Sequence, residues 1–270
     1  MIPFHKMQGA GNDFVVIDNR SLELSMDQII AITPRLCDRR FGIGADGTLV
    51  LQKSGVADYT MTYRNADGSD AGMCGNGGRC LAKFAVLKGF PPLHTFTVHD
   101  HIYEASVHDQ GVSIKFPVEV TPIPLGRLGG YELLQVDAAT EHVVIVVDEP
   151  ALEQEEELRR SGRIIRSSQK AFPKGTNVNF MSVRANDHLG LQTYERGVEN
   201  LTLACGTGAI ASSIAHHYLQ GLRNEKAGMK VDCKGGRLTV DFEFQPSRNI
   251  YHHIYLSGPA DFVFEGTISR

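Results

Sequence analysis

MCGNG at residues 73–77 and ACGTG at residues 204–208 share one pattern, a cysteine followed by Gly-x-Gly. Each segment opens a stretch that is poor in charge near its start, which predicts a buried helix beginning at the cysteine. One such segment could arise by chance. Two copies predict a pair of thiols that are placed alike in two similar halves of the chain.

Strand signals dominate the rest of the chain, and the two halves follow the same order. In each half, strands lead to a polar loop, then to Cys-Gly-x-Gly, a buried helix and further strands. The prolines and glycines between residues 117 and 130 mark the crossover between the halves. We expect helices at residues 27–38, 74–89, 151–160 and 205–221. We expect strands at residues 14–18, 48–52, 59–63, 101–108, 112–116, 132–137, 142–147, 178–183, 189–196, 229–233, 237–244, 250–256 and 262–264.

A cysteine at the start of a helix is suited to proton transfer. Backbone N–H groups and the helix macrodipole stabilise a thiolate there, and the same N–H groups can hold a carboxylate. One thiolate could remove an α-proton from one face of a carbon while the other thiol returns a proton to the opposite face. The alternative is that each cysteine is merely a small buried residue. The repeated Gly-x-Gly disfavours this alternative for Cys74 and Cys205, whereas we expect Cys37, Cys80 and Cys233 to be structural.

Polar residues lie near both segments in the sequence. Asn12 belongs to a glycine-rich stretch near the N-terminus, Asn65 precedes Cys74, and Arg196 precedes Cys205. Such Asn, Asp and Gly residues often do no more than form turns. The functional alternative is that they bind the polar groups of a small zwitterion, with Arg196 pairing with a carboxylate.

Composition limits the classes of protein to consider. The chain has 270 residues, of which 42% are hydrophobic and 21% are charged, with a net charge of −4. It can therefore form a sizeable core, and it has no basic run for nucleic acid. No apolar run approaches a membrane span, and the first residues lack the apolar core of a signal peptide. Five cysteines are unlike a secreted disulfide framework, so we expect a cytoplasmic location.

Two other patterns point to cofactors or metals but lack the necessary context. Residues 42–47 fit the dinucleotide-binding G-x-G-x-x-G, but the preceding residues are not strand-like and a strand rather than a helix follows. The histidines at 99, 101, 216–217 and 252–253 have no cysteine or carboxylate ligands at a familiar spacing. We therefore expect neither a cofactor nor a metal.

Eight short motifs, taken in order, resemble diaminopimelate epimerase, a family of cofactor-independent enzymes of lysine and peptidoglycan-precursor synthesis. Each motif alone is weak, but all of them in order are highly specific. They are KMQGAGNDF at 6–14, FGIGADG at 41–47, NADGS at 65–69, MCGNG at 73–77, GTNV at 175–178, YERG at 194–197, ACGTG at 204–208 and GPA at 258–260.

The resemblance implies a reaction and a set of site residues. The reaction is the interconversion of LL- and meso-2,6-diaminopimelate by a thiol and a thiolate, without pyridoxal phosphate. Cys74 and Cys205 match the catalytic pair, Glu195 matches an acid near the reacting centre, and His142 matches a supporting histidine. The positions that match substrate-binding residues are Asn12, Asn65, Gly75, Asn76, Asn177, Arg196, Gly206 and Thr207.

The resemblance also implies the fold and the assembly. The expected fold is α+β, with two pseudo-symmetric lobes that each consist of a mostly antiparallel sheet curled around a central helix. Together with the crossover, this places residues 1–117 and 257–270 in a first lobe with Cys74, and residues 118–256 in a second lobe with Cys205. The family commonly forms homodimers. We therefore expect a homodimer that binds a small zwitterionic amino acid, and neither nucleic acid nor a membrane.

Two positions depart from the family pattern. Thr140-Glu141-His142 stands where the family usually has Asn-Pro-His, so a shorter hydroxyl replaces an amide that would contact the distal end of the substrate, and a carboxylate enters beside it. Gly47 stands where some relatives carry a polar side chain that contacts substrate. Thr140 and Gly47 are therefore weaker candidates for substrate binding.

These departures leave two alternatives to diaminopimelate epimerisation. One is a cofactor-free racemase or isomerase for another amino acid on the same fold. Proline racemase relatives share the paired cysteines, whereas phenazine-type isomerases of this fold lack them. The other alternative is a non-catalytic amino-acid-binding protein, in which the two thiols would have no evident purpose.

Overall fold

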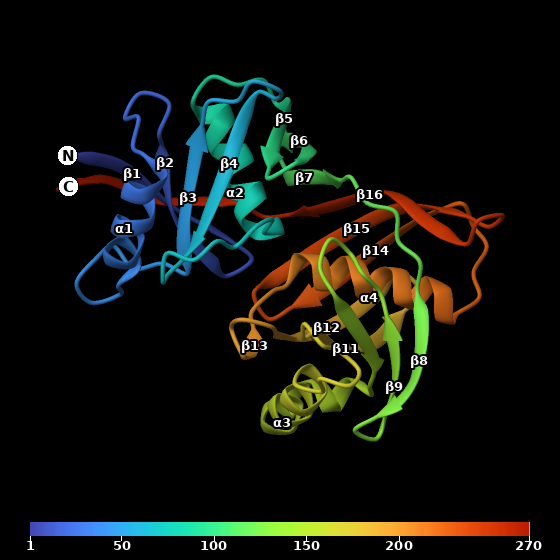
Figure 1. Ribbon diagram of the computed structural model, residues 1–270. Helices are drawn as coiled ribbons and strands as arrows, with labels where there is room; N and C mark the ends of the chain where they lie inside the picture. Colours follow the sequence, from blue (N-terminus) through green and yellow to red (C-terminus); the bar gives the residue numbers. More distant parts are fainter. Residues whose placement is uncertain (270) are drawn as a thin grey trace. The chain divides into compact units, whose positions relative to one another are not determined.

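The computed structural model describes residues 1–269, which form seventeen strands and four α-helices (Figure 1). Two compact units make up the chain. The first unit comprises Met1–Pro117 and the segment from Ser257 onward, and the second unit comprises Val118–Leu256.

The sheet of the first unit curls around one helix. Its strands pair in the order β17-β1-β2-β3-β4-β5-β6-β7, and only the β2–β3 and β4–β5 pairs among these are parallel. Helix α2 contacts β1, β2, β3, β4, β6 and β7, and helix α1 packs on β3 and β4. The elements are β1 (Ile2–Gly9), β2 (Asn12–Asp18), α1 (Met26–Cys37), β3 (Gly47–Gln52), β4 (Tyr59–Asn65), α2 (Gly75–Leu87), β5 (Leu93–Val98), β6 (His101–His108), β7 (Gly111–Phe116) and β17 (Asp261–Ile268).

The second unit repeats this arrangement. Its pairs β10–β11 and β12–β14 are parallel and its pairs β11–β12 and β14–β15 are antiparallel, as in the run from β2 to β6. Helix α4 contacts β10, β11, β12, β14 and β15. The elements are β8 (Ile123–Leu128), β9 (Tyr131–Gln135), β10 (His142–Val146), the 3₁₀-helix η1 (Glu149–Glu153), α3 (Glu155–Arg166), β11 (Asn177–Ala185), β12 (His188–Glu195), β13 (Asn200–Thr202), α4 (Gly206–Leu219), β14 (Lys226–Cys233), β15 (Gly236–Gln245) and β16 (Ile250–Gly258), whose end belongs to the first unit.

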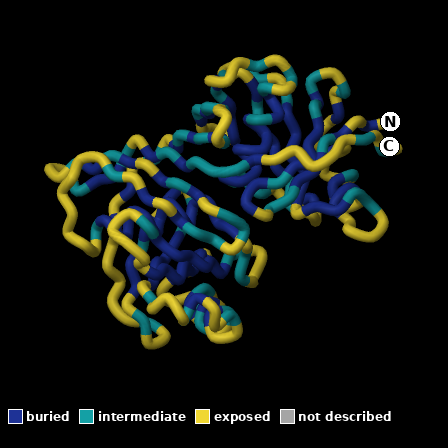
Figure 2. Tube along the Cα trace, turned by 180° about the vertical axis from the view of Figure 1, so that it is seen from behind, coloured by how far each residue is buried: buried dark blue, intermediate teal, exposed yellow. Residues whose placement is uncertain are grey.

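The predicted α+β class with two pseudo-symmetric parts is confirmed. In each unit a helix, α1 or α3, follows the first strand of the parallel pair, and the buried helix, α2 or α4, follows the next antiparallel strands. Both buried helices are rich in small residues, so strands can approach them closely. At Gly78, for example, a Cβ atom would lie 2.8 Å from Ile114 Cδ1. Figure 2 shows buried backbone, in dark blue, inside each unit.

Some predicted elements differ from the observed ones. The helix expected at 151–160 is correct only from residue 155 onward, because Glu149–Glu153 forms a 3₁₀-helix and α3 begins at Glu155. Three glutamates in the first turn of α3 suit a helix N-terminus. Strands β1, β5, β8 and β13 were not predicted. In β1 the polar Lys6 interrupts the apolar pattern, and β8 lies in the Pro/Gly-rich stretch that was assigned to the crossover.

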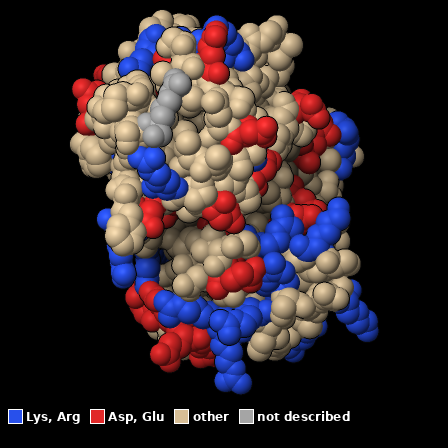
Figure 3. Space-filling model, turned by 60° about the vertical axis from the view of Figure 1, so that its left-hand side comes forward, with Lys and Arg blue, Asp and Glu red and all other residues tan. Residues whose placement is uncertain are grey.

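Charged side chains on the surface are of both signs. Acidic and basic side chains are interspersed on the face shown in Figure 3. Several form ion pairs, such as Arg166 with Glu199 at 2.7 Å. Within residues 1–269, no helix has the length and apolar character that crossing a membrane would require.

A partly buried ionic network fixes the start of β2. Lys6 Nζ lies 2.7 Å from Asp13 Oδ2, and Arg39 Nη2 lies 2.7 Å from Asp13 Oδ1 and 2.8 Å from Asp46 Oδ1. Burial raises the pKa of Asp13, but hydrogen bonds from Arg39 and Lys6 outweigh it and lower the pKa to about 2. This network joins β1 and β2 to the loop that precedes β3.

The Asp13→Asn variant tests the network. It leaves the buried Lys6 ammonium without its carboxylate, so we expect the free energy of unfolding at pH 7 to fall by about 2–3 kcal/mol. Since the folded pKa lies below the usual 3.8, the wild type should lose this stabilisation as the pH falls from about 4 to 2, and the variant should not. Urea unfolding measures both effects.

The matched control is Glu23→Gln, which removes the exposed ion pair with Lys53. We expect it to change stability by less than about 1 kcal/mol. An Asp13→Asn variant as stable as this control would contradict the interpretation of the network.

Candidate active site

Cys74 and Cys205 occupy equivalent positions at the starts of α2 and α4. Both are N-cap residues, with backbone angles of φ −115°, ψ 118° for Cys74 and φ −112°, ψ 112° for Cys205. Each sulfur accepts a hydrogen bond from the backbone N–H three residues later, Gly77 or Gly208, at 3.4 Å. Each thiol therefore sits at a helix terminus, where aligned peptide dipoles favour negative charge.

In the first unit, Asn12 lies beside the Cys74 thiol. Its Oδ1 atom is 3.8 Å from Cys74 Sγ, and its Nδ2 donates to Asp46, a member of the ionic network. Asn65 ends β4, and its Nδ2 donates to Ser69 Oγ at 3.0 Å in the turn that leads toward Cys74. The first unit thus brings Asn12 to the thiol and holds it there through β2.

Gly47 has no room for a side chain. A Cβ atom there would lie 2.4 Å from the carbonyl oxygen of Arg64 and 2.4 Å from a ring carbon of Tyr63. Local packing therefore requires glycine at this position, which exposes no side chain.

Arg79 is a buried arginine that the sequence reasoning missed. Its Nη2 donates to Asn76 Oδ1 at 2.7 Å, its Nη1 to the carbonyl of Gly75 at 3.2 Å, and its Nε to the carbonyl of Pro259 at 3.2 Å. It therefore fixes the first turn of α2 and holds Asn76 by its amide oxygen. The available signal was a single arginine near the start of a helix that is otherwise poor in charge.

In the second unit, Thr207 links the Cys205 thiol to His142. Thr207 Oγ1 is 3.7 Å from Cys205 Sγ and 2.9 Å from His142 Nε2. Asn179 Nδ2 donates to His142 Nδ1 at 3.0 Å, so the hydrogen-bond network assigns the imidazole proton to Nε2. Burial, and then the charge of Arg196, lower the pKa of His142 to about 3. The imidazole is therefore neutral at pH 7 and acts as a hydrogen-bonding support.

The same network extends to Arg196. Asn177 Nδ2 donates to Thr140 Oγ1 at 3.4 Å, and Asn177 Oδ1 accepts from the backbone N–H of Arg196 at 2.9 Å. Arg196 Nη1 in turn donates to Glu141 Oε2 at 2.9 Å. Sequence reasoning noted that Glu141 enters beside Thr140 but did not select it as a site residue.

Glu195 lies next to Arg196 at the end of β12. It is half-buried, and its Oε1 accepts a hydrogen bond from Thr202 Oγ1 of β13. The second unit thus gathers several predicted residues around one helix start. They are Cys205, Gly206, Thr207, Thr140, His142, Asn177, Glu195 and Arg196.

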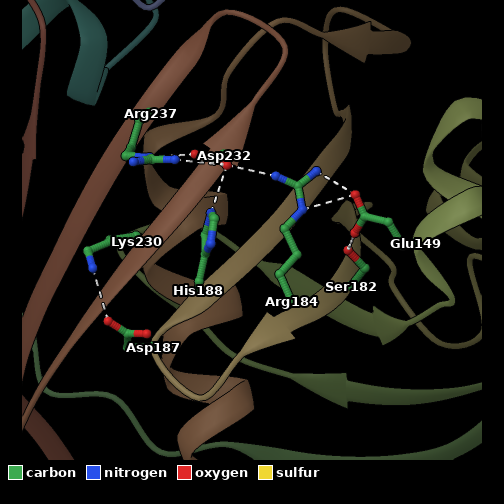
Figure 4. Close-up of polar contacts among 8 residues, drawn as sticks. All are labelled: Glu149, Ser182, Arg184, Asp187, His188, Lys230, Asp232 and Arg237. Carbon is green, nitrogen blue, oxygen red and sulfur yellow. Dashed lines mark hydrogen bonds and ion pairs between the residues drawn. The ribbon is translucent and has the colours of Figure 1, made fainter.

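A separate polar network lies on strands β11, β12, β14 and β15. Asp232 accepts hydrogen bonds from Arg237, His188 and Arg184 (Figure 4). The hydrogen bond from Arg237 is the largest cause that holds the pKa of Asp232 well below its usual range. These charges neutralise one another across four strands, so we interpret the network as structural.

One group of potential metal ligands occurs among the described residues. The ligand atoms of Glu243, His252 and His253 lie within 4.8 Å of one another, so the fold supplies the carboxylate that the sequence spacing did not indicate. Glu243 is already paired with Lys226 at 2.9 Å and with His253 at 3.1 Å. These two ion pairs explain the position of the Glu243 carboxylate without a bound metal ion.

Comparison with known proteins identifies the family. The family model for diaminopimelate epimerase matches residues 4–115 and 134–263 of the chain. The chain belongs to the diaminopimelate epimerase family. The resemblance carried by the eight sequence motifs is thereby confirmed.

Relatives within the diaminopimelate epimerase family match almost end to end. The diaminopimelate epimerase of Chlorobaculum tepidum is 39% identical over 269 residues, covering 97% of this chain and 100% of its own. That of Flavobacterium psychrophilum is 38% identical over 265 residues, covering 98% of this chain and 99% of its own.

Solved structures outside the family share the fold. A phenazine biosynthesis protein of the PhzF family from Bacillus anthracis aligns with a TM-score of 0.76 and 14% identity, over 99% of each chain. A hydroxyproline epimerase from Agrobacterium vitis aligns with a TM-score of 0.67 and 12% identity, over 98% of this chain and 91% of its own. At such low identity these matches show the fold alone.

The glycines three residues after each cysteine allow a matched test of the two helix starts. In Gly208→Ala, the new Cβ would lie 2.4 Å from Asn179 Oδ1, which belongs to the support of His142. In Gly77→Ala, it would meet the flexible end of Leu49 at 3.0 Å. We expect Gly208→Ala to lower the free energy of unfolding by about 1–3 kcal/mol and Gly77→Ala by less. Urea unfolding measures the difference, and equal stability of the two variants would contradict this account.

Proposed function

We propose that the protein interconverts LL- and meso-2,6-diaminopimelate by two-base proton transfer, without a cofactor. The observation that supports this best is the shared N-cap geometry of Cys74 and Cys205 in a chain of the diaminopimelate epimerase family. One cysteine, as the thiolate, removes the α-proton and becomes a thiol. The other, as the thiol, donates its proton to the opposite face of the same carbon and becomes a thiolate. The roles exchange when the reaction runs in reverse.

The helix starts would stabilise the charge that develops in this reaction. Loss of the α-proton moves negative charge onto the carboxylate of the reacting end, which becomes enolate-like. Backbone N–H groups at a helix N-terminus are preorganised donors for such a charge. We assign this role to Gly75 and Asn76 in the first unit and to Gly206 and Thr207 in the second.

The remaining residues would hold the substrate in place. We assign Glu195 to the reacting centre and Asn12, Asn65, Asn177 and Arg196 to the polar groups of the substrate. The neutral His142 would position Thr207 beside Cys205, because its Nε2–H is shared between the hydroxyls of Thr207 and Thr140, each at 2.9 Å. Thr140 and the backbone of Gly47 remain weaker candidates for contact with substrate.

The family also suggests where the protein acts and how it assembles. We propose that the two units are the two catalytic lobes and that the protein acts as a cytoplasmic homodimer in lysine and peptidoglycan-precursor synthesis. The odd cysteine count and the need for reduced thiols support a reducing compartment. Sedimentation equilibrium measures the assembly, and a mass of one chain would contradict the dimer.

Replacement of each cysteine tests the mechanism. With LL-diaminopimelate as substrate, wild type should produce the meso isomer and exchange its α-proton with D₂O. Cys74→Ser and Cys205→Ser should each lower the epimerisation rate by about 10²–10⁴-fold, because a serine hydroxyl is a much weaker acid than a thiol. NMR of the α-position and chiral chromatography measure these rates.

The matched control is Cys233→Ser, a partly buried cysteine outside the proposed site, which should keep the wild-type rate. Wild-type exchange rates in both Cys74→Ser and Cys205→Ser would refute the thiol pair. A wild type that leaves diaminopimelate unchanged but racemises another amino acid from a panel would favour the alternative that the Thr140-Glu141 departure raises.

A further inference from the structure

Glu141 and Arg196 form an ion pair at the part of the second unit that departs from the family pattern. Glu141 Oε2 accepts from Arg196 Nη1 at 2.9 Å, and both side chains reach solvent, with exposed fractions of 38% and 30%. A ligand can therefore reach both partners. The side chain of Asn177 holds the backbone of both residues. Its Oδ1 accepts from the Arg196 N–H, and its Nδ2 donates to the Glu141 carbonyl.

Arg196 presents an unused edge of its guanidinium group. Within residues 1–269, its side-chain hydrogen bonds all come from Nη1, which donates to Glu141 and to the carbonyls of Lys174 and Gly175 at 3.2 and 3.3 Å. Nε and Nη2 form the side-on pair of donors that matches a carboxylate. The three contacts of Nη1 anchor that end of the guanidinium group and leave the Nε–Nη2 edge available to a ligand.

Glu141 presents an unused acceptor. Its Oε2 binds Arg196, while its Oε1 makes no hydrogen bond to any residue from 1 to 269. An ionised carboxylate accepts several hydrogen bonds, so Oε1 can bind an ammonium group without release of Arg196. A donor edge and an anionic acceptor thus belong to one ion pair, and they complement the carboxylate and the ammonium of an amino-acid end.

Thr140 is not able to supply that acceptor. Its Oγ1 lies 2.9 Å from His142 Nε2, whose single proton it shares with Thr207 Oγ1. It also accepts from Asn177 Nδ2 at 3.4 Å and donates to Thr207 Oγ1 at 3.4 Å. A hydroxyl has one proton to donate and two lone pairs to accept with, and at Thr140 each of them already faces one of these protein partners. The amide oxygen that the family's Asn would offer is therefore not replaced by the Thr140 hydroxyl.

We propose that Glu141 binds the distal ammonium of diaminopimelate while the Nε–Nη2 edge of Arg196 binds the distal carboxylate. This assignment rests on the proposed function and makes Glu141 a specificity-determining residue. It selects a substrate whose distal end is a zwitterion over one whose distal end is only a carboxylate.

Paired ligands test the proposal with Glu141→Gln. Isothermal titration calorimetry gives the Kd of diaminopimelate and of L-2-aminopimelate, which lacks the distal ammonium. The variant should bind diaminopimelate about tenfold more weakly, since a charge-assisted hydrogen bond is lost, and L-2-aminopimelate with unchanged affinity. Glu141→Asp, which keeps the charge, should recover part of the loss. Glu119→Gln, which removes an exposed ion pair with Arg248 at 3.2 Å, is the matched control and should bind both ligands as wild type does.

Each other outcome overturns the proposal. An equal loss with both ligands would mean that Glu141 acts only by orienting Arg196, and a gain with both would mean that it competes with the substrate carboxylate. Unchanged affinities in the variant, or a wild type that binds neither ligand, would also refute it. Failure of the proposed function would instead appear as wild-type protein that does not epimerise diaminopimelate, a result independent of the binding measurements.

Discussion

The candidate chemistry depends on how a helix begins inside a curled sheet. The first N–H groups of such a helix have no partners within it, and burial makes an unsatisfied donor costly. In both units the cysteine N-cap meets this demand with its sulfur, which accepts from the third residue of the helix. The contact that completes the helix therefore also places the thiol where negative charge is favoured. Stability of the helix start and reactivity of the thiol have a common cause.

The two helix starts have the same N-cap geometry, but different side chains hold each of them in place. In the first unit, the charged Arg79 is buried beneath the first turn and the Asp13 network holds Asn12. In the second unit, the support is a neutral His142 with hydrogen bonds to Thr207 and Asn179. A neutral imidazole holds its neighbours in place without adding a charge beside the thiol.

The sequence was sufficient to predict the features that local rules determine. Gly-x-Gly after each cysteine predicted two buried helices, and both begin at the predicted residues. The strand β1 was missed because the burial of Lys6 depends on Asp13, a partner that only the pairing of β1 with β2 brings close. Asn179 and Arg79 were missed for the same reason, because their roles arise from contacts between elements. The helix expected at 151–160 was misplaced because the charge pattern alone does not mark where a 3₁₀-turn gives way to an α-helix.

Chemistry and recognition are separable in this fold. The proposed proton-transfer groups sit on helix starts that the sheet topology repeats in both units. The groups that would read the distal end of a substrate lie on loops before β10 and after β12, where packing constrains them less. At Thr140 the hydroxyl contacts both His142 and Thr207, so it takes part in the support of the second helix start. Under the proposal, recognition of a zwitterionic end comes from a neighbouring charged pair, and the same loops provide Glu141 with Arg196 as that pair.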